Sequence, residues 1–299
     1  MPDHPRARRR LLRLGGASAL AGSAAAGLFA VTLLGVGCAS VPKVPEADRP
    51  VAYTDEPWAR VLSAVVVGED GLVEYAKLAE GSPARADLKV YLNAVGRFGP
   101  KTTPEAFPTE ADRLAYHLNA YNAFMLEKWA REGGATADPD DKVGWVTWFL
   151  AGFALDGGRR SMHGLEQRLI RPTYRDARIH FALVCGALSC PPLLAEPYRG
   201  ADLDAQFADV ATRWFQAPDG LVVAEDGTVT VSRILDWYDG DFDGGEPFDS
   251  FADLFATYLP PGPRRDAAVA AAEAGELEFM GYDWTINSPA AARAQTAGR

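Results

Sequence analysis

Cysteine and histidine are scarce in this chain of 299 residues, which contains three cysteines and four histidines. No Cys-x-x-Cys pair occurs, His4 lies in the N-terminal segment, and His163 and His180 are far apart. Structural zinc needs four such ligands at short spacings, so the sequence does not predict a zinc site. It also has no phosphate-binding loop, no dinucleotide-binding glycine pattern and no Gly-x-Ser-x-Gly elbow. We therefore expect no nucleotide chemistry and no cofactor.

Basic residues are outnumbered, with 30 Lys and Arg against 40 Asp and Glu and a formal charge of −10. Residues 1–37 hold five arginines and one aspartate, so the remainder is more acidic than the whole chain. An acidic surface repels phosphate groups, which argues against nucleic acid as a partner and against broad binding to anionic lipid. The residues after 37 are numerous enough to bury one sizeable core.

Residues 1–37 have the features of an export signal. The run Arg8-Arg9-Arg10-Leu11-Leu12-Arg13 resembles the twin-arginine pattern, and an apolar stretch follows it. Gly37-Cys38 then fits a bacterial lipobox, although Gly35 stands where leucine is usual, and predicts lipidation of Cys38. An uncleaved membrane anchor and plain secretion are the alternatives. Each predicts an exported protein, periplasmic or anchored on the outer side of the cytoplasmic membrane, where disulfides are permitted.

Composition divides the rest of the chain into three parts. Residues 38–56 contain spaced prolines and no apolar period, which is typical of a tether. Residues 57–287 are expected to form a single domain. Residues 288–299 are rich in alanine and polar residues, which predicts a flexible tail. The membrane, reached through a lipid or an N-terminal anchor, is therefore an expected partner.

Helical and strand patterns follow one another in residues 57–287 without regular βαβ order. This predicts an α+β domain, with helices packed on a small mixed or antiparallel sheet. The strongest helical pattern covers Thr109–Arg131, and the apolar run Ile179–Cys185 indicates a buried strand. Asp226-Gly227 is typical of a hairpin turn between two strands. Further helices are expected at 58–66, 84–95, 163–170, 201–215, 248–258 and 264–274, and further strands at 70–75 and 277–284.

Five short motifs occur in a fixed order and together resemble the domain-of-unknown-function 547 family. The resemblance covers roughly residues 58–287 and implies no settled activity. Some eukaryotic members of that family join the domain to glutaredoxin-like modules, which implies an association with thiol chemistry. The motifs are Leu118-Asn-Ala-Tyr-Asn-Ala123, Leu165-Glu166 with Arg171-Pro172, His180-Phe-Ala-Leu-Val-Cys185 with Ser189-Cys-Pro-Pro192, Trp237-Tyr238 with Asp241-Phe242, and Tyr282-Asp-Trp-Thr-Ile-Asn287.

The chain departs from the family pattern at two positions. Gln167 follows Leu165-Glu166 where the family usually has histidine, and His117 precedes Leu118-Asn119 where tryptophan is usual. If the family histidine served as a base or a metal ligand, its loss would leave this chain impaired or rewired.

The two cysteines near the middle of the chain allow three interpretations. Cys185 and Cys190 can form a structural disulfide, if their Cα atoms come within roughly 7 Å. They can also form a redox-active pair, or Cys190 can act as the nucleophile of a hydrolase or acyltransferase on an envelope peptide or amide. His180 is then the expected base, with Glu166 orienting it, by analogy with transglutaminase-like and papain-like enzymes. Residues five apart on a strand face opposite sides, which argues against a pair of His180 and Cys185.

A non-catalytic envelope binding module is the rival hypothesis. In that hypothesis the cysteines form a disulfide and a pocket holds a small molecule or a peptide. Its candidate binding residues are Asn119, Tyr121, Asn122, Trp237 and Tyr238. Asn119 and Asn122 lie three apart on one flank of a predicted helix, so they either line the pocket or satisfy buried backbone groups of a neighbouring loop.

A weak metal motif occurs at Asp239, Asp241 and Asp243, followed by Gly244. This matches the first half of a calcium-binding loop, but the twelfth position is Ser250 rather than glutamate. The favoured interpretation is an acidic surface loop, with no metal bound.

Overall fold

The computed structural model of the protein describes residues 43–133 and 149–297. The predicted export signal, Cys38 and its lipidation lie outside the described residues. All the described elements belong to one compact unit, Gly37–Arg299. Within the described ranges, no helix has both the length and the hydrophobicity that crossing a membrane requires.

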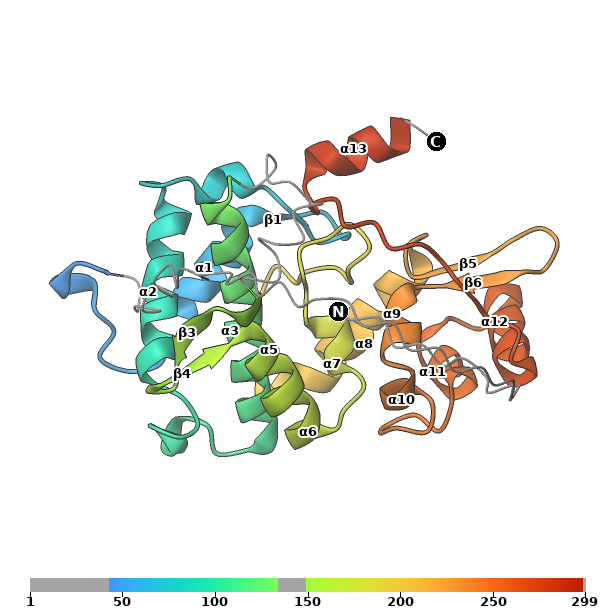
Figure 1. Cartoon of the computed structure of the whole chain (residues 1–299), viewed down its shortest axis with the longest axis horizontal. Coiled ribbons are helices and arrows are strands. Elements are labelled where there is room, and N and C mark those ends of the chain that lie inside the picture. Colours follow the sequence, from blue (N-terminus) through green and yellow to red (C-terminus); the bar gives the residue numbers. More distant parts are fainter. Residues whose placement is uncertain (1–42, 134–148, 298–299) are drawn as a thin grey trace, which may run out of the picture. The chain divides into compact units, whose positions relative to one another are not determined.

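Three helices pack together in the first part of the domain: α1 (Glu56–Val65), α2 (Pro83–Arg97) and α3 (Glu110–Arg131) (Figure 1). The start of α3 is fixed by a capping box, in which Thr109 and Asp112 each bind the other's backbone N–H. Every residue of α3 from Leu114 to Trp129 is buried. This helix therefore lies at the centre of the packing, and its polar side chains point into protein.

The strands of the described residues form three small sheets. β1 (Val66–Val67) pairs antiparallel with β2 (Leu72–Val73), and β3 (Gly152–Leu155) pairs antiparallel with β4 (Gly158–Ser161). β5 (Leu221–Val223) and β6 (Val229–Val231) form the predicted hairpin, and β7 (Glu278–Phe279) lies parallel to β6. The α+β class is confirmed, with the strands divided among separate sheets. β7 is shorter than the strand predicted over 277–284.

The segment that leads to the cysteines differs from its predicted structure. A strand is expected over 179–185, but Ile179–Ala182 forms helix α7 and the chain becomes extended from Leu183. All four residues of α7 are buried, and a short apolar run has no period that distinguishes a buried helix from a buried strand. The helix predicted over 163–170 is confirmed by three continuous helical segments, α5 (Met162–Leu165), the π-helix η5 (Glu166–Ile170) and α6 (Arg171–Tyr174).

The later helices largely follow their predicted positions. α8 (Leu203–Gln216), α11 (Phe251–Tyr258) and α12 (Pro263–Ala274) match predicted helices. Two short helices, α9 (Arg233–Trp237) and α10 (Asp239–Phe242), have no counterpart among the predictions, and α13 (Pro289–Ala297) lies in the segment predicted to be a tail. The remaining short 3-10 turns are η1 (Glu46–Asp48), η2 (Tyr75–Leu78), η3 (Pro104–Ala106) and η6 (Gly200–Asp202).

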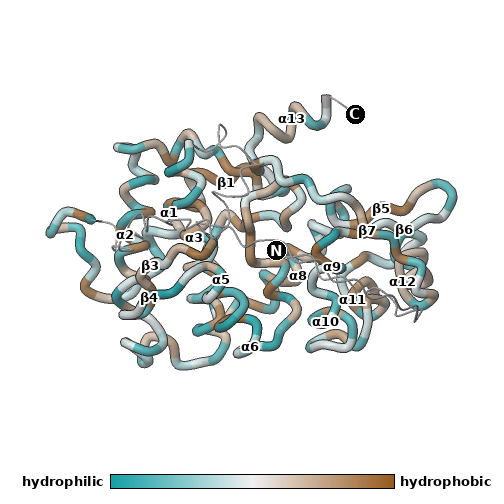
Figure 2. The backbone as a smooth tube through the Cα atoms, viewed as in Figure 1, coloured by the Kyte–Doolittle hydropathy of each residue, from teal (hydrophilic) through white to brown (hydrophobic). Residues whose placement is uncertain are grey.

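One hydrophobic core runs through these elements. Hydrophobic and hydrophilic residues alternate along the helices in Figure 2, as expected for helices with one face on a core. Phe181 of α7 packs against Trp214 and Phe215 of α8 and against Phe242 of α10. This packing fixes α7, and thereby places the loop with the two cysteines between α3 and the C-terminal part of the chain.

Candidate functional site: the Cys185–Cys190 disulfide and its surroundings

The loop after α7 is held by an amide of α3. Asn122 donates from Nδ2 to the carbonyl of Ala182 at 2.9 Å, and its Oδ1 accepts the N–H of Val184 at 3.0 Å. Gly186 then turns the chain with φ +84°, where a Cβ would lie 2.3 Å from Nε1 of Trp129. The side chain of Asn122 thus satisfies the backbone groups of the residues on both sides of Leu183. These two hydrogen bonds fix the path of the chain between α7 and Cys185.

Cys185 and Cys190 form a disulfide, with their Cα atoms 6.4 Å apart. Cys185 is partly exposed, whereas only 8% of Cys190 is exposed. The loop between them pairs with the segment before α13: Leu188 donates to the carbonyl of Thr285 at 2.7 Å, and Asn287 donates to that of Gly186 at 2.9 Å. Figure 1 shows this loop beside the C-terminal segment.

Both sulfurs contact the hydroxyl group of Tyr282. Its oxygen lies 3.2 Å from Sγ of Cys185 and 3.1 Å from Sγ of Cys190. The N–H of Cys185 also donates to Sγ of Cys190 at 3.1 Å. Burial of the hydroxyl, together with the nearby charges of Asp219 and Asp283, raises the pKa of Tyr282, so the group keeps its proton and can donate it in a hydrogen bond to sulfur.

Glu166 lies in a separate polar cluster next to this tyrosine. Its carboxylate, in a residue only 5% exposed, accepts the hydroxyl of Tyr238 at 2.7 Å, the hydroxyl of Tyr121 at 3.1 Å and Nε2 of Gln167 at 2.6 Å. Tyr282 is close enough to Tyr121 and Tyr238 to contribute to their raised pKa values, of which burial is the main cause. The carboxylate of Glu166 is therefore held by tyrosines and an amide rather than by a histidine.

His180 is paired with Asp241, which lies on α10. Nε2 of His180 is 2.7 Å from Oδ2 of Asp241, and its ring stacks on Tyr238 with centroids 3.8 Å apart. Burial lowers the pKa of His180 although Asp241 opposes that shift. Burial alone would raise the pKa of Asp241, but the hydrogen bonds from His180 and from Arg171, at 2.8 and 2.9 Å, hold it well below its usual range. Arg171 also donates to Oε1 of Gln167, which links the two carboxylates.

The predicted catalytic arrangement of Cys190, His180 and Glu166 is not formed in this structure. His180 contacts Asp241, Tyr238 and Phe242, and Sγ of Cys190 is bonded to Cys185. The pairing of His180 follows from α10, an element that the sequence did not predict. The other histidines are also engaged elsewhere: Nδ1 of His117 lies 2.8 Å from the hydroxyl of Tyr174, and the ring of His163 packs edge-on against Phe149.

The predicted binding residues fall into two groups. Asn119 pairs with the backbone of Tyr198: its Nδ2 donates to the carbonyl at 2.8 Å, and its Oδ1 accepts the N–H at 2.9 Å. Asn122 holds the cysteine loop. Both amides satisfy buried backbone groups, which is one of the two alternatives for them, and Asn122 also lines a small cavity. Tyr121 and Tyr238 bind Glu166, and Trp237 stacks on Trp284 and contacts the tilted ring of Tyr282.

The segment that resembles half a calcium loop adopts another structure. Asp239–Phe242 forms helix α10, and the carboxylate of Asp241 is occupied by Arg171 and His180. Elsewhere in residues 43–133 and 149–297, no group of three or more His, Cys, Asp or Glu side chains is placed to hold a metal ion.

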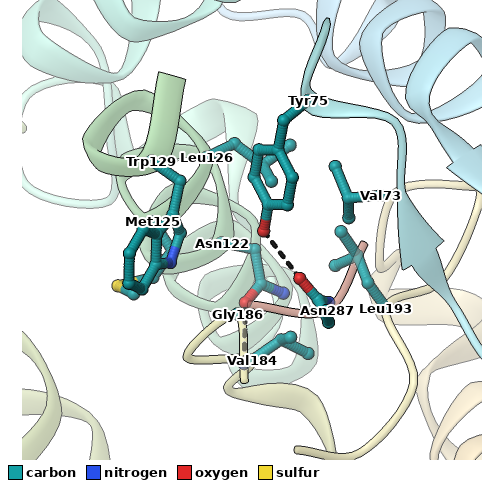
Figure 3. Close-up of a pocket in the computed structure, with 10 residues that line it drawn as sticks. All are labelled: Val73, Tyr75, Asn122, Met125, Leu126, Trp129, Val184, Gly186, Leu193 and Asn287. Atoms are coloured by element: carbon teal, nitrogen blue, oxygen red, sulfur yellow. Dashed lines mark hydrogen bonds between the residues drawn. The ribbon is translucent and has the colours of Figure 1, made fainter. Parts of the chain in front are cut away.

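A small cavity lies on the side of the cysteine loop that faces α3 (Figure 3). Its volume of about 10 Å³ suits about one water molecule. Asn122, Gly186 and Tyr75 line it, and the hydroxyl of Tyr75 donates to Oδ1 of Asn287 at 2.6 Å. The cavity is too small for an organic ligand.

Comparison with known proteins bears on the same region. Residues 105–215 match a protein-family model. Its description is protein of unknown function, DUF547. The DUF547 match includes Asn122, Glu166, His180 and both cysteines, and it ends before Asp241 and Tyr282. No curated protein and no solved structure matches the chain.

The sequence assigns no role to Tyr282, and it singles out Asp241 only as part of a weak calcium motif. Both residues occur in the motifs that carry the resemblance to DUF547, and this was the only sign in the sequence that they belong to the site. Neither motif assigns a role to its residue.

Proposed function

We propose that the protein is a thiol–disulfide redox module in which Cys185 and Cys190 form a reversible bond. The observation that carries the proposal is the position of the Tyr282 hydroxyl, within hydrogen-bond distance of both sulfurs. A structural disulfide needs no such donor. A redox pair does, because breaking the bond creates a thiolate that must be stabilised away from bulk water.

The reaction partner is a dithiol, such as a protein with two neighbouring cysteines. Its thiolate attacks Sγ of Cys185, which forms a mixed disulfide and breaks the bond to Cys190. Cys190 leaves as a thiolate and takes up a proton. The second thiol of the partner then displaces Cys185, which is also protonated. Two electrons and two protons pass from the partner to this chain, and the partner becomes a disulfide.

The geometry favours Cys185 as the attacked sulfur and Cys190 as the leaving group. Cys185 is the more exposed of the two residues. Cys190 is buried, and its sulfur accepts the N–H of Cys185 and shares the single O–H of Tyr282 with Sγ of Cys185. Hydrogen bonds to a charged group contribute about 1.5–3 kcal/mol each, so the negative charge is better stabilised on Cys190.

Single-cysteine variants test this assignment. In Cys190→Ser, the remaining Cys185 should form a mixed disulfide rapidly with an aromatic disulfide reagent. In Cys185→Ser, the buried Cys190 should react at least roughly tenfold more slowly. Mass spectrometry of the folded variants gives both rates. Faster reaction of Cys190, or no reaction of either cysteine until the protein is denatured, would overturn the proposal and leave a structural disulfide.

A thiol hydrolase remains the second candidate, for the reduced protein only. The two donors on the sulfur of Cys190 favour its thiolate, which a nucleophile requires. Reduced protein should then form an acyl adduct on Cys190 with an activated ester, and Cys185→Ser should retain the adduct. A mass spectrum without any adduct on Cys190 would exclude this function.

Export and lipidation are part of the same proposal, because a reversible disulfide needs an environment that permits oxidation. The twin-arginine-like run and Gly37-Cys38 support them. Fractionation of cells that express the full chain should place it in the envelope, and Cys38→Ala should abolish a lipid mass increment. Recovery of the unmodified full chain in the cytosol would contradict this part of the proposal.

A further inference from the structure

Three aromatic rings form a surface directly beside the disulfide. Trp237 stacks on Trp284 with centroids 5.7 Å apart, and Tyr282 contacts Trp237 at 4.8 Å and Trp284 at 4.5 Å. Trp237 and Tyr282 are partly exposed, and Trp284 is 40% exposed. The inner edge of this aromatic surface is the Tyr282 hydroxyl that contacts both sulfurs. A molecule that reacts with the disulfide from this side therefore approaches along these rings.

Two carboxylates adjoin the ring residues in the sequence, and a third lies near Tyr282. Asp236 precedes Trp237, Asp283 lies between Tyr282 and Trp284, and Asp219 is near enough to raise the pKa of Tyr282. Arg233 pairs with Asp236 at 3.0 Å. Asp283 accepts hydrogen bonds from the N–H of Thr285 and the amide of Gln295, which are neutral donors and leave its charge in place.

Exposed aromatic rings next to carboxylates favour the binding of positively charged side chains. The faces of tryptophan and tyrosine rings attract Lys and Arg side chains, and carboxylates attract them further. The whole chain carries a formal charge of −10, so its electrostatic field also attracts basic partners and repels acidic ones.

We infer that the partner of the disulfide is a basic polypeptide segment carrying two neighbouring cysteines, which docks on Trp237, Tyr282 and Trp284. The inference rests on the proposed function. A Lys or Arg side chain of the segment lies over the rings near Asp283, the first cysteine of the segment attacks Sγ of Cys185, and the second then releases Cys185 from the mixed disulfide. Electrostatic docking raises the local concentration of the thiol and selects the partner, whereas the exchange chemistry is that of the disulfide itself.

Charge-matched peptides test the inference on the full folded chain. Two peptides carry the same pair of neighbouring cysteines, flanked by lysines in one and by glutamates in the other. A small neutral dithiol serves as the reference. The measurement is the second-order rate of reduction of the Cys185–Cys190 bond. We expect the basic peptide to react at least roughly tenfold faster than the acidic one at low salt, and the ratio to shrink at high salt.

Two variants locate the effect. Asp283→Asn should lower the ratio of the basic to the acidic rate by roughly two- to fivefold, because one carboxylate of the aromatic surface is lost. Glu225→Gln removes one exposed charge at the turn of the β5–β6 hairpin and should keep the wild-type ratio. If the small dithiol reduces the bond and the two peptides react at equal rates, this inference is overturned and the proposed function stands. No reaction with any thiol would overturn both.

Discussion

The contact of Tyr282 with the two sulfurs makes the sharpest prediction. Tyr282→Phe removes only the hydroxyl group and keeps the ring that packs against Trp237 and Trp284. The fold should therefore persist, while the sulfur of Cys190 loses one of its two donors. If the hydroxyl stabilises the leaving thiolate, the variant should be reduced more slowly.

The magnitude follows from the contact of 3.1 Å. A hydrogen bond to a charged group contributes about 1.5–3 kcal/mol. About half of the charge develops on sulfur in the transition state of thiol–disulfide exchange. Losing the hydrogen bond should therefore raise the activation free energy by about 0.7–1.5 kcal/mol. With a factor of ten for each 1.36 kcal/mol, reduction by a neutral dithiol should slow roughly three- to tenfold.

The assay follows reduction of the folded protein by dithiothreitol, with acid quenching, alkylation and mass counting of free thiols. Tyr75→Phe is the matched control, because it removes another buried hydroxyl that binds the same C-terminal segment, at Asn287, without touching sulfur. Its rate should equal that of the wild type, although its free energy of unfolding falls. Equal rates for Tyr282→Phe and wild type would refute the role of the hydroxyl.

Three further predictions concern the scaffold around the site. Asn122→Ala should lower the free energy of unfolding by about 2–5 kcal/mol in urea titrations, because the Ala182 carbonyl and the Val184 N–H lose their buried partner; a loss below about 1 kcal/mol would contradict this. Burial lowers the pKa of His117 from 6.5 to about 4, so the unfolded chain binds its proton first and stability is lost as pH falls from 6.5 towards 4. His117→Gln should reduce that loss by up to about 3 kcal/mol, and an identical pH profile would show that His117 is not involved. Gly186→Ala should lower the midpoint of thermal unfolding, because the added Cβ meets a tryptophan ring at a positive φ, and an unchanged midpoint would show that the loop adapts.

Local sequence signals predicted the helices well. The helical pattern over Thr109–Arg131 predicted α3, and Asp226-Gly227 marked the hairpin of β5 and β6. These signals act over three or four residues and need no knowledge of the fold. The segment 179–185 lacked such a signal, since every residue of α7 is apolar or buried and neither a helical nor a strand period is visible.

The candidate site depended on contacts between distant parts of the chain. The sequence drew attention to Cys185, Cys190 and His180, and it indicated that Asn122 could hold a buried loop. The partner of His180 is 61 residues away on a helix of four residues, and the partner of the sulfurs is more than 90 residues away. Side-chain pairing at such separations is fixed by packing, which a single sequence does not display.

Reversibility of the Cys185–Cys190 bond in the folded protein is the central claim, and a redox titration tests it most directly. The full chain is equilibrated with defined ratios of reduced and oxidised dithiothreitol, free thiols are counted after alkylation, and circular dichroism checks the fold. We predict one two-electron transition between a folded disulfide and a folded dithiol form, with Tyr282→Phe shifted towards the disulfide form. A bond that stays oxidised at every ratio until the protein unfolds would contradict the account.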